Sequence, residues 1–107
     1  MSATKTLLEF AAKAAGIKLG LPLSRGGFDN ECGYWNPLTD SAAALELAAM
    51  LCLTVQIGRL DGTIVVTSNN DDRIYAAERY DFDLASKMEA IRIAIVYAAA
   101  ELGKVML

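Results

Sequence analysis

The stretch that decides the fold runs from Tyr34 to Asp40 and reads Tyr-Trp-Asn-Pro-Leu-Thr-Asp. Pro37 fixes its own φ angle and favours an extended conformation for Asn36, so a helix from upstream cannot continue through this motif. Thr39 or Asp40 can then cap a new helix by accepting a hydrogen bond from a free amide in its first turn. The Tyr34–Asp40 motif therefore predicts an abrupt start for the alanine- and leucine-rich helix that follows.

Working outward, the sequence predicts three helices. The first covers about Thr4–Ala15 and ends at Gly16 in a left-handed conformation. The second covers about Ser41–Cys52 and should be mostly buried, because Leu45, Ala48, Ala49 and Cys52 share one face and little of it is polar. The third runs from Leu84 or Ser86 to Leu102; Ser86 and Glu89 have the spacing of a capping box, and Gly103 is placed to stop the helix.

Between the last two helices the hydrophobic period changes from that of a helix to that of strands. Asp61-Gly62 predicts a hairpin between Leu53–Leu60 and Thr63–Ser68, and Arg73–Tyr80 predicts another strand. Upstream, Ser24–Asn30 has the composition of a loop, and Glu31–Trp35 predicts a short strand. The expected fold is α+β: one domain over residues 1–107, with three helices packed on a small, mostly antiparallel sheet.

Composition excludes several classes of function. The 107 residues have a formal net charge of -3 and contain no histidine, the commonest general base and metal ligand. The ten basic residues are scattered, which disfavours direct binding to duplex DNA. Cys32 and Cys52 are expected to be reduced thiols. We therefore expect no catalytic residues, no metal, no cofactor and no membrane span, and a cytoplasmic location.

Two kinds of binding residue are candidates. In Ser24-Arg25-Gly26-Gly27, backbone amides, a hydroxyl and a guanidinium could converge on an anion, with Tyr34 or Tyr75 stacking on a nucleotide base. The segment matches no phosphate-loop or dinucleotide pattern, and the alternative is an ordinary surface loop. Trp35 could anchor a partner protein, but a core tryptophan that pins the motif explains its neighbours without any ligand.

Acidic residues between the second and third helices offer a further alternative. A divalent metal could bind there and support a carboxylate enzyme, but the calcium-loop spacing is absent and Arg73 and Arg79 interrupt the charge. A solvated loop is the favoured interpretation. The residues concerned are Asp71, Asp72, Glu78, Asp81 and Asp83.

The segment Ile93–Ala100 is apolar on every face of its helix. Such a helix is usually buried all round. Either it lies between the sheet and the other helices, or part of it forms a subunit interface, where its alanines would permit close helix contact. The second explanation predicts a homodimer.

The sequence also resembles a known family. Its motif Trp35–Asp40, its opening Leu8–Ile17 and its segments Ala44–Ala48, Glu89–Arg92 and Ile95–Gly103 resemble the phage ABA-sandwich domain family of small tailed-phage and prophage accessory proteins. More distantly, the layout is similar to NinX-type proteins of temperate phages. The resemblance implies a sheet between helical layers, in the manner of an α/β/α sandwich, and carries no established catalytic residues.

Together these observations predict a phage accessory protein that acts by non-covalent binding to a host protein, as an inhibitor of a defence or regulatory factor. The alternative is an oligomer that sequesters a small anionic nucleotide.

The nucleotide alternative has a direct test. If the Ser24–Gly27 loop binds a phosphate group, phosphate-bearing nucleotides should raise the melting temperature through mass action, and Arg25→Ala should abolish the rise. A thermal-shift screen measures both, and an unchanged melting temperature with every nucleotide would remove this alternative.

Overall fold

The computed structural model describes residues 2–20, 27–30, 33–57, 63–68, 74–79 and 84–104. Within these ranges the chain has three helices and five strands, and its strand pairs are antiparallel, so the predicted α+β class is confirmed. The elements are, in order, α1 (Ser2–Ala15), β1 (Phe28–Asn30), β2 (Gly33–Trp35), α2 (Ser41–Met50), β3 (Leu53–Ile57), β4 (Thr63–Ser68), β5 (Ile74–Arg79) and α3 (Leu84–Lys104).

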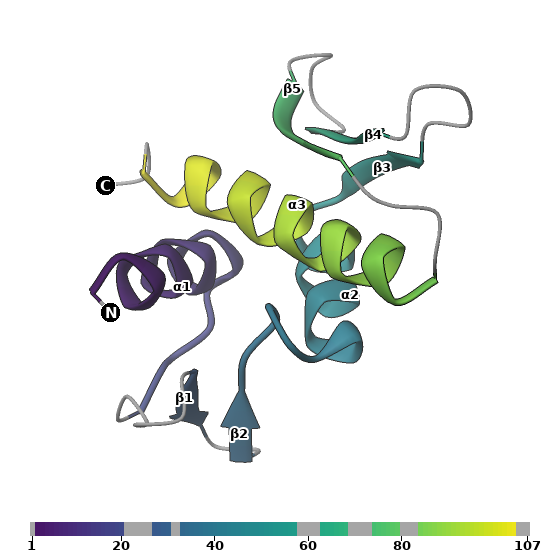
Figure 1. The fold of residues 1–107 in the computed structure, drawn as a ribbon. Helices are drawn as coiled ribbons and strands as arrows, with labels where there is room; N and C mark the ends of the chain where they lie inside the picture. The colour runs from purple at the N-terminus through teal and green to yellow at the C-terminus, as the bar shows by residue number, and fades with distance from the viewer. Residues whose placement is uncertain are drawn as a thin grey trace.

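Helix α3 lies at the centre of the molecule (Figure 1). The sheet β3-β4-β5 lies on one side of α3, while α1 and α2 lie on the other side. The hairpin β1-β2 forms a separate two-stranded sheet below α1 and α2 in this view. Among the described elements, the helices thus lie on one face of the three-stranded sheet, whereas the resemblance implied helical layers on both.

Two buried clusters explain why the segment Ile93–Ala100 of α3 is apolar on every side. Toward the sheet, α3 presents small side chains that pack on the inner face of β4: Ala90, Ala94 and Ala98 contact Ile64 and Val66. Toward the other helices, it contributes Ile95, Val96 and Ala99 to a second cluster that includes Leu8, Ala11, Ala12, Phe28, Trp35, Ala43, Ala44, Leu47 and Ala48. The first explanation offered for the apolar segment, a central helix covered from two sides, therefore accounts for its buried residues.

Helices α1 and α3 pack closely because small residues lie where they meet. Gly103 lies inside α3, and a Cβ atom added to it would overlap the backbone carbonyl of Phe10 in α1. The prediction that Gly103 stops the helix is wrong, because its missing side chain serves helix packing and not a turn. Gly16, in contrast, has φ +73° at the end of α1, as predicted.

The three-stranded sheet follows the expected order, with β4 between β3 and β5. Strand β3 pairs with β4 without a register shift, from Leu53 opposite Ser68 to Ile57 opposite Ile64. The register between β4 and β5 shifts at Val66/Thr67. The Asp61-Gly62 turn lies outside the described residues.

The loop predicted over Ser24–Asn30 is wrong at its end, where Phe28–Asn30 forms β1 and pairs with β2. Two contacts stabilise the strand Phe28–Asn30 although its composition is typical of a loop. Phe28 is buried in the larger cluster, and the Gly20 amide donates a hydrogen bond to the Asp29 carbonyl at 2.7 Å. Tertiary burial and backbone pairing together stabilise a strand that local propensity does not favour.

The buried face of α2 also differs from the prediction. Its buried residues are Ala43, Ala44, Leu47 and Ala48, whereas Leu45 is 68% exposed. The helix ends at Met50, and Cys52 adopts φ +53° in the connection to β3, which turns the chain out of the helix. Helix α3 begins at Leu84, so Ser86 lies inside it and the capping-box interpretation is wrong.

Gly103→Ala tests the contact between α1 and α3. At an exposed helix position this change stabilises a protein by about 1 kcal/mol. Here we expect the opposite sign, a loss of about 1–3 kcal/mol in the free energy of unfolding, because the methyl group would force the two helices apart. Urea denaturation measures the change.

Leu45→Ala, at an exposed position in α2, is the control and should alter the free energy of unfolding by less than about 0.5 kcal/mol. A Gly103→Ala protein more stable than the wild type would contradict the close approach of the helices.

Candidate functional site

Asn36 is the centre of the Tyr34–Asp40 motif. Its side chain is 5% exposed; Oδ1 accepts a hydrogen bond from the Leu38 amide at 3.1 Å, and Nδ2 donates to the Tyr34 hydroxyl at 3.1 Å. Its backbone carbonyl accepts hydrogen bonds from the amides of Thr39 and Asp40 at 3.1 and 2.9 Å. One buried side-chain amide thus satisfies the turn that Pro37 begins.

The other motif residues have structural roles as well. Asp40 is the N-cap of α2, and its Oδ1 accepts a hydrogen bond from the Ala42 amide at 3.0 Å, as predicted. Trp35 is 5% exposed and belongs to the larger buried cluster, as the core interpretation predicts. A ring buried to this extent offers little surface to a partner.

Arg92 attaches the motif to the central helix. Its Nε donates to the Leu38 carbonyl at 3.0 Å, and one terminal nitrogen donates to Ser41 Oγ at 2.9 Å. Leu38 is therefore held at its amide by Asn36 and at its carbonyl by Arg92. The sequence shows only that Arg92 precedes an apolar stretch, so this partner 54 residues away was not predicted.

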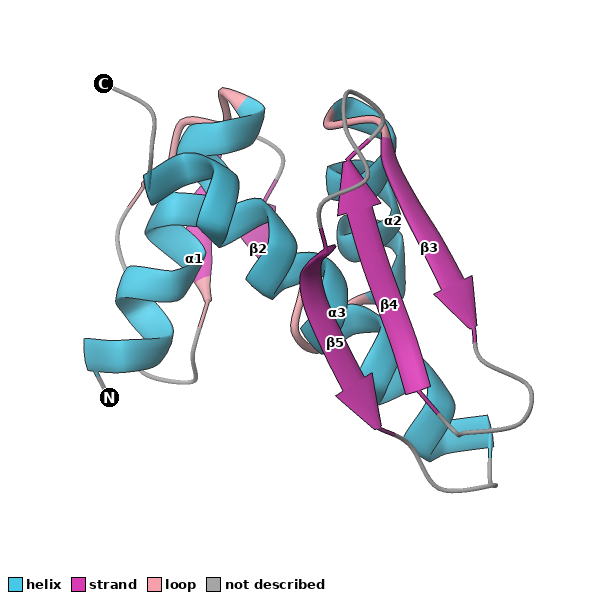
Figure 2. Cartoon of the chain, turned by 90° about the horizontal axis from the view of Figure 1, so that it is seen from above, coloured by secondary structure: helices cyan, strands magenta, loops and turns pink. Residues whose placement is uncertain are grey.

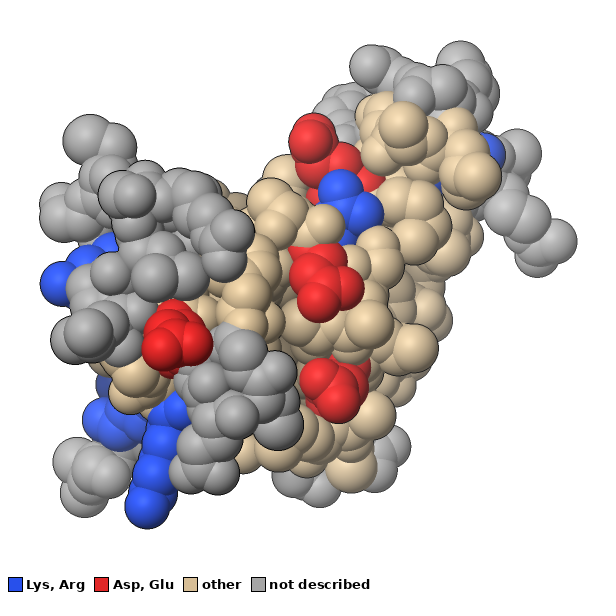
Figure 3. Space-filling view, turned by 90° about the horizontal axis from the view of Figure 1, so that it is seen from below, with Lys and Arg blue, Asp and Glu red and all other residues tan. Residues whose placement is uncertain are grey.

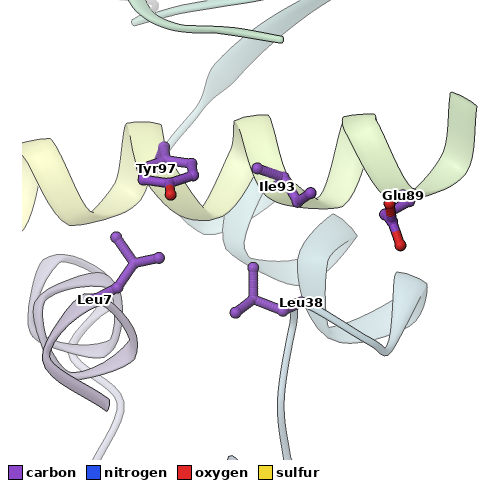
Figure 4. A pocket seen from close by; sticks show the side chains of 5 residues that line it. All are labelled: Leu7, Leu38, Glu89, Ile93 and Tyr97. Carbon is purple, nitrogen blue, oxygen red and sulfur yellow. The ribbon is translucent and has the colours of Figure 1, made fainter. Parts of the chain in front are cut away.

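This fixed position of Leu38 forms one wall of a groove of about 300 Å³ beside α3. Leu7 of α1 forms another wall, and α3 supplies Glu89, Ile93 and Tyr97, spaced four residues apart along one side of the helix. Figure 4 shows Leu7 and Leu38 pointing toward α3 from two separate segments. The groove thus lies on the part of α3 that neither buried cluster covers.

The chemistry of the groove is mainly apolar. Leu7, Leu38 and Ile93 supply aliphatic surface, and Tyr97, which is 45% exposed, adds an aromatic ring with a hydroxyl group. Glu89 places an exposed carboxylate at one end, as Figure 4 shows. A volume of about 300 Å³ lies at the lower end of the range for ligand pockets, so the groove suits a few side chains better than a large cofactor.

The predicted binding residues do not all meet in this structure. Gly27 lies against the motif with φ +77°, and a Cβ atom there would come within 2.7 Å of Asn36 Cβ and 3.0 Å of Tyr34 Cε1. Gly27, Tyr34 and Trp35 are therefore neighbours, and tight packing explains the glycine. Tyr75 lies in β5, on the far side of α3 from the β1-β2 hairpin (Figure 1). Arg25 and Gly26 lie outside the described residues.

On the face seen from below, the described charged side chains form no patch of a single sign. Figure 3 shows acidic and basic side chains close to one another near one end of this face and more widely spaced elsewhere. In the described parts of the chain, no three His, Cys, Asp or Glu residues are grouped so as to hold a metal ion. The acidic residues proposed as an alternative metal site fall outside those parts, except Glu78 in β5. The described Cys52 is exposed and forms no disulfide.

Comparisons with known proteins give no relative: no family model, no curated protein sequence and no solved structure matches the chain. The resemblance to the phage ABA-sandwich family therefore stays a prediction. None of the described helices is both long enough and apolar enough to cross a membrane.

Asn36→Ala tests whether the motif depends on the buried amide. We expect a loss of about 1–3 kcal/mol in the free energy of unfolding, because the Leu38 amide and the Tyr34 hydroxyl would lose their partner. Urea denaturation measures the loss.

Tyr34→Phe is the matched control, since it removes one of the two side-chain bonds at a residue that is 40% exposed. It should cost less than about 1 kcal/mol. Equal losses in the two variants would contradict the central role of Asn36.

Proposed function

We propose that this chain is a small phage accessory protein that acts in the host cytoplasm by non-covalent binding, as an inhibitor of a host defence or regulatory factor. The observation that carries this proposal is the groove formed by Leu7, Leu38, Glu89, Ile93 and Tyr97. The phage origin rests on the sequence resemblance, and the mode of action rests on the groove.

The groove favours a protein segment as its occupant. Apolar side chains of a partner would replace water against Leu7, Leu38 and Ile93, at about 25 cal/mol for each Å² of apolar surface buried. Tyr97 is the kind of residue that dominates the binding energy of interfaces, because it combines a large ring with a hydroxyl group. A lysine or arginine of the partner would meet the Glu89 carboxylate, which forms no ion pair with any residue that the structure describes.

The same chemistry disfavours a nucleotide in this groove. A phosphate group would need cationic or amide donors, whereas among the described residues that line the groove the only charged side chain is a carboxylate. Nucleotide binding, if it occurs, would have to use the loop that contains Arg25.

Affinity capture from a bacterial host lysate at physiological salt tests the proposal with two groove variants. We expect the wild type to retain a host protein that Glu89→Lys and Tyr97→Lys release, because one variant reverses the charge and the other replaces the aromatic contact with a cation. The fall in affinity should be at least tenfold for Tyr97→Lys, a loss of about 1.4 kcal/mol or more, because truncating an interface hot spot costs about 2 kcal/mol or more.

Two control variants make the same charge changes outside the groove. Glu46→Lys and Leu45→Lys both alter exposed positions on α2, and both should retain the partner. Equal retention by the groove variants and the controls would exclude the groove. Capture of no host protein by the wild type would count against the binding function itself.

A further inference from the structure

The two edge strands of the three-stranded sheet differ in how they resist pairing with another chain. Strand β5 carries adjacent charged residues, Glu78 and Arg79, and its register with β4 is interrupted at Val66/Thr67. Charged residues and irregular register are the features by which edge strands avoid further pairing. By this measure β5 is a protected edge.

Strand β3 has none of these features. Its sequence, Leu-Thr-Val-Gln-Ile, contains no charged residue and no proline, and its register with β4 is regular throughout. Within the described chain it pairs with β4 on one side only, and Figure 2 shows it as the outermost strand on that side of the sheet. A regular, uncharged edge strand presents a row of backbone donors and acceptors to a second strand.

The side chains of β3 add a second observation. Leu53 and Val55 face inward and pack against the two buried clusters. Ile57 has the same parity along the strand, yet it is 52% exposed. On the inner face of β3, the large apolar side chain of Ile57 is therefore left mostly uncovered.

We propose that β3 pairs antiparallel with β3 of a second copy of this chain, around a two-fold axis that passes midway between the two Val55 residues. The two three-stranded sheets would then form one continuous sheet. Such an interface is isologous, so each copy contributes the same strand.

This register follows from the sequence of the strand. With Val55 opposite Val55 of the second copy, Leu53 lies opposite Ile57 and Thr54 lies opposite Gln56. Apolar residues thus meet apolar residues on the inner face, and polar residues meet polar residues on the outer face. The exposed Ile57 then lies beside Leu53 of the second copy. All five residues of the strand are paired in this register.

A shift by one residue would remove this match. Leu53 would then lie opposite Gln56, and the helices of the second copy would lie on the opposite face of the combined sheet. Apolar side chains would meet polar ones along the whole edge. The Val55-centred register is therefore the one that the side-chain pattern favours.

This proposal is independent of the function proposed above, because β3 supplies no residue to the groove. It also places self-association at a different surface from the homodimer predicted through Ile93–Ala100. Of that segment, Tyr97 is the one residue that remains exposed, whereas six are buried: Ala94, Ile95, Val96, Ala98, Ala99 and Ala100.

Analytical ultracentrifugation of the full chain over micromolar to millimolar concentrations tests the proposal. We expect the mass to rise with concentration toward twice 11.5 kDa. Thr54→Lys with Gln56→Lys should give a monomer, because like charges would face each other twice across the axis. Thr54→Lys with Gln56→Glu should restore the dimer, because each lysine would face a glutamate of the second copy, and high salt should weaken it.

Both double variants change exposed side chains, and circular dichroism should show the same folded structure for each. A wild type that stays monomeric at every concentration would overturn the proposal, as would a dimer that persists in the double lysine variant. Tyr97→Lys separates the two surfaces: loss of the dimer in this variant, with retention in the double lysine variant, would place self-association at α3 and overturn pairing through β3.

Discussion

The fold depends on the burial of α3 from two opposite sides. Its alanines at positions 90, 94 and 98 lie against β4, and its residues at 95, 96 and 99 lie against α1 and α2. Leu53, Val55 and Ile91 contact both clusters, so the two cores are joined around the helix and through its side chains. On the side that faces the sheet, small residues permit the close approach, because the three alanines leave little side-chain volume between α3 and β4. Gly103 extends the same principle to the backbone of α1.

Helix α3 is covered on two sides, and the Tyr34–Asp40 motif determines the shape of the surface on its third side. Asn36 and Arg92 hold Leu38 at both its amide and its carbonyl, so the groove wall is fixed by hydrogen bonds rather than by a flexible loop. The Arg92 guanidinium also reaches Ser41, the first residue of α2, beside the Asp40 cap. The hydrogen bonds of the motif therefore start helix α2 and position Leu38. The same motif contributes the buried Trp35 to the core. A structural motif can in this way determine the shape of a surface groove without contributing a reactive group.

The sequence predicted those elements whose signals are local. Gly16 ends α1, Asp40 caps α2, and the alternating residues of β3 and β4 pair as expected, because a left-handed glycine, a cap and a period of two each act within a few residues. The errors occur where distant contacts decide. Leu45 and Leu47 are chemically alike, yet Leu45 is exposed and Leu47 is buried, because only the position of α3 determines which side of α2 is covered. Phe28–Asn30 pairs as a strand because its neighbours bury it, although its composition is that of a loop.

The groove could not be predicted for the same reason, since Leu7, Leu38 and Tyr97 come from three segments that nothing in the sequence links. Its one periodic signal is the spacing of Glu89, Ile93 and Tyr97. This spacing is hard to recognise in the sequence because most of the neighbouring positions in the helix are also apolar. Once the packing partners of α3 are known, the surface of this helix can be divided into two buried faces and one accessible stripe. The exposed apolar groups at Tyr97 and Ile57 then lie at the two surfaces for which we propose different partners: a groove shaped by side chains suits a different protein, whereas a regular strand edge suits an identical copy. On these two proposals, a chain without histidine acts through two separate contact surfaces, one determined by side-chain packing and the other by backbone register.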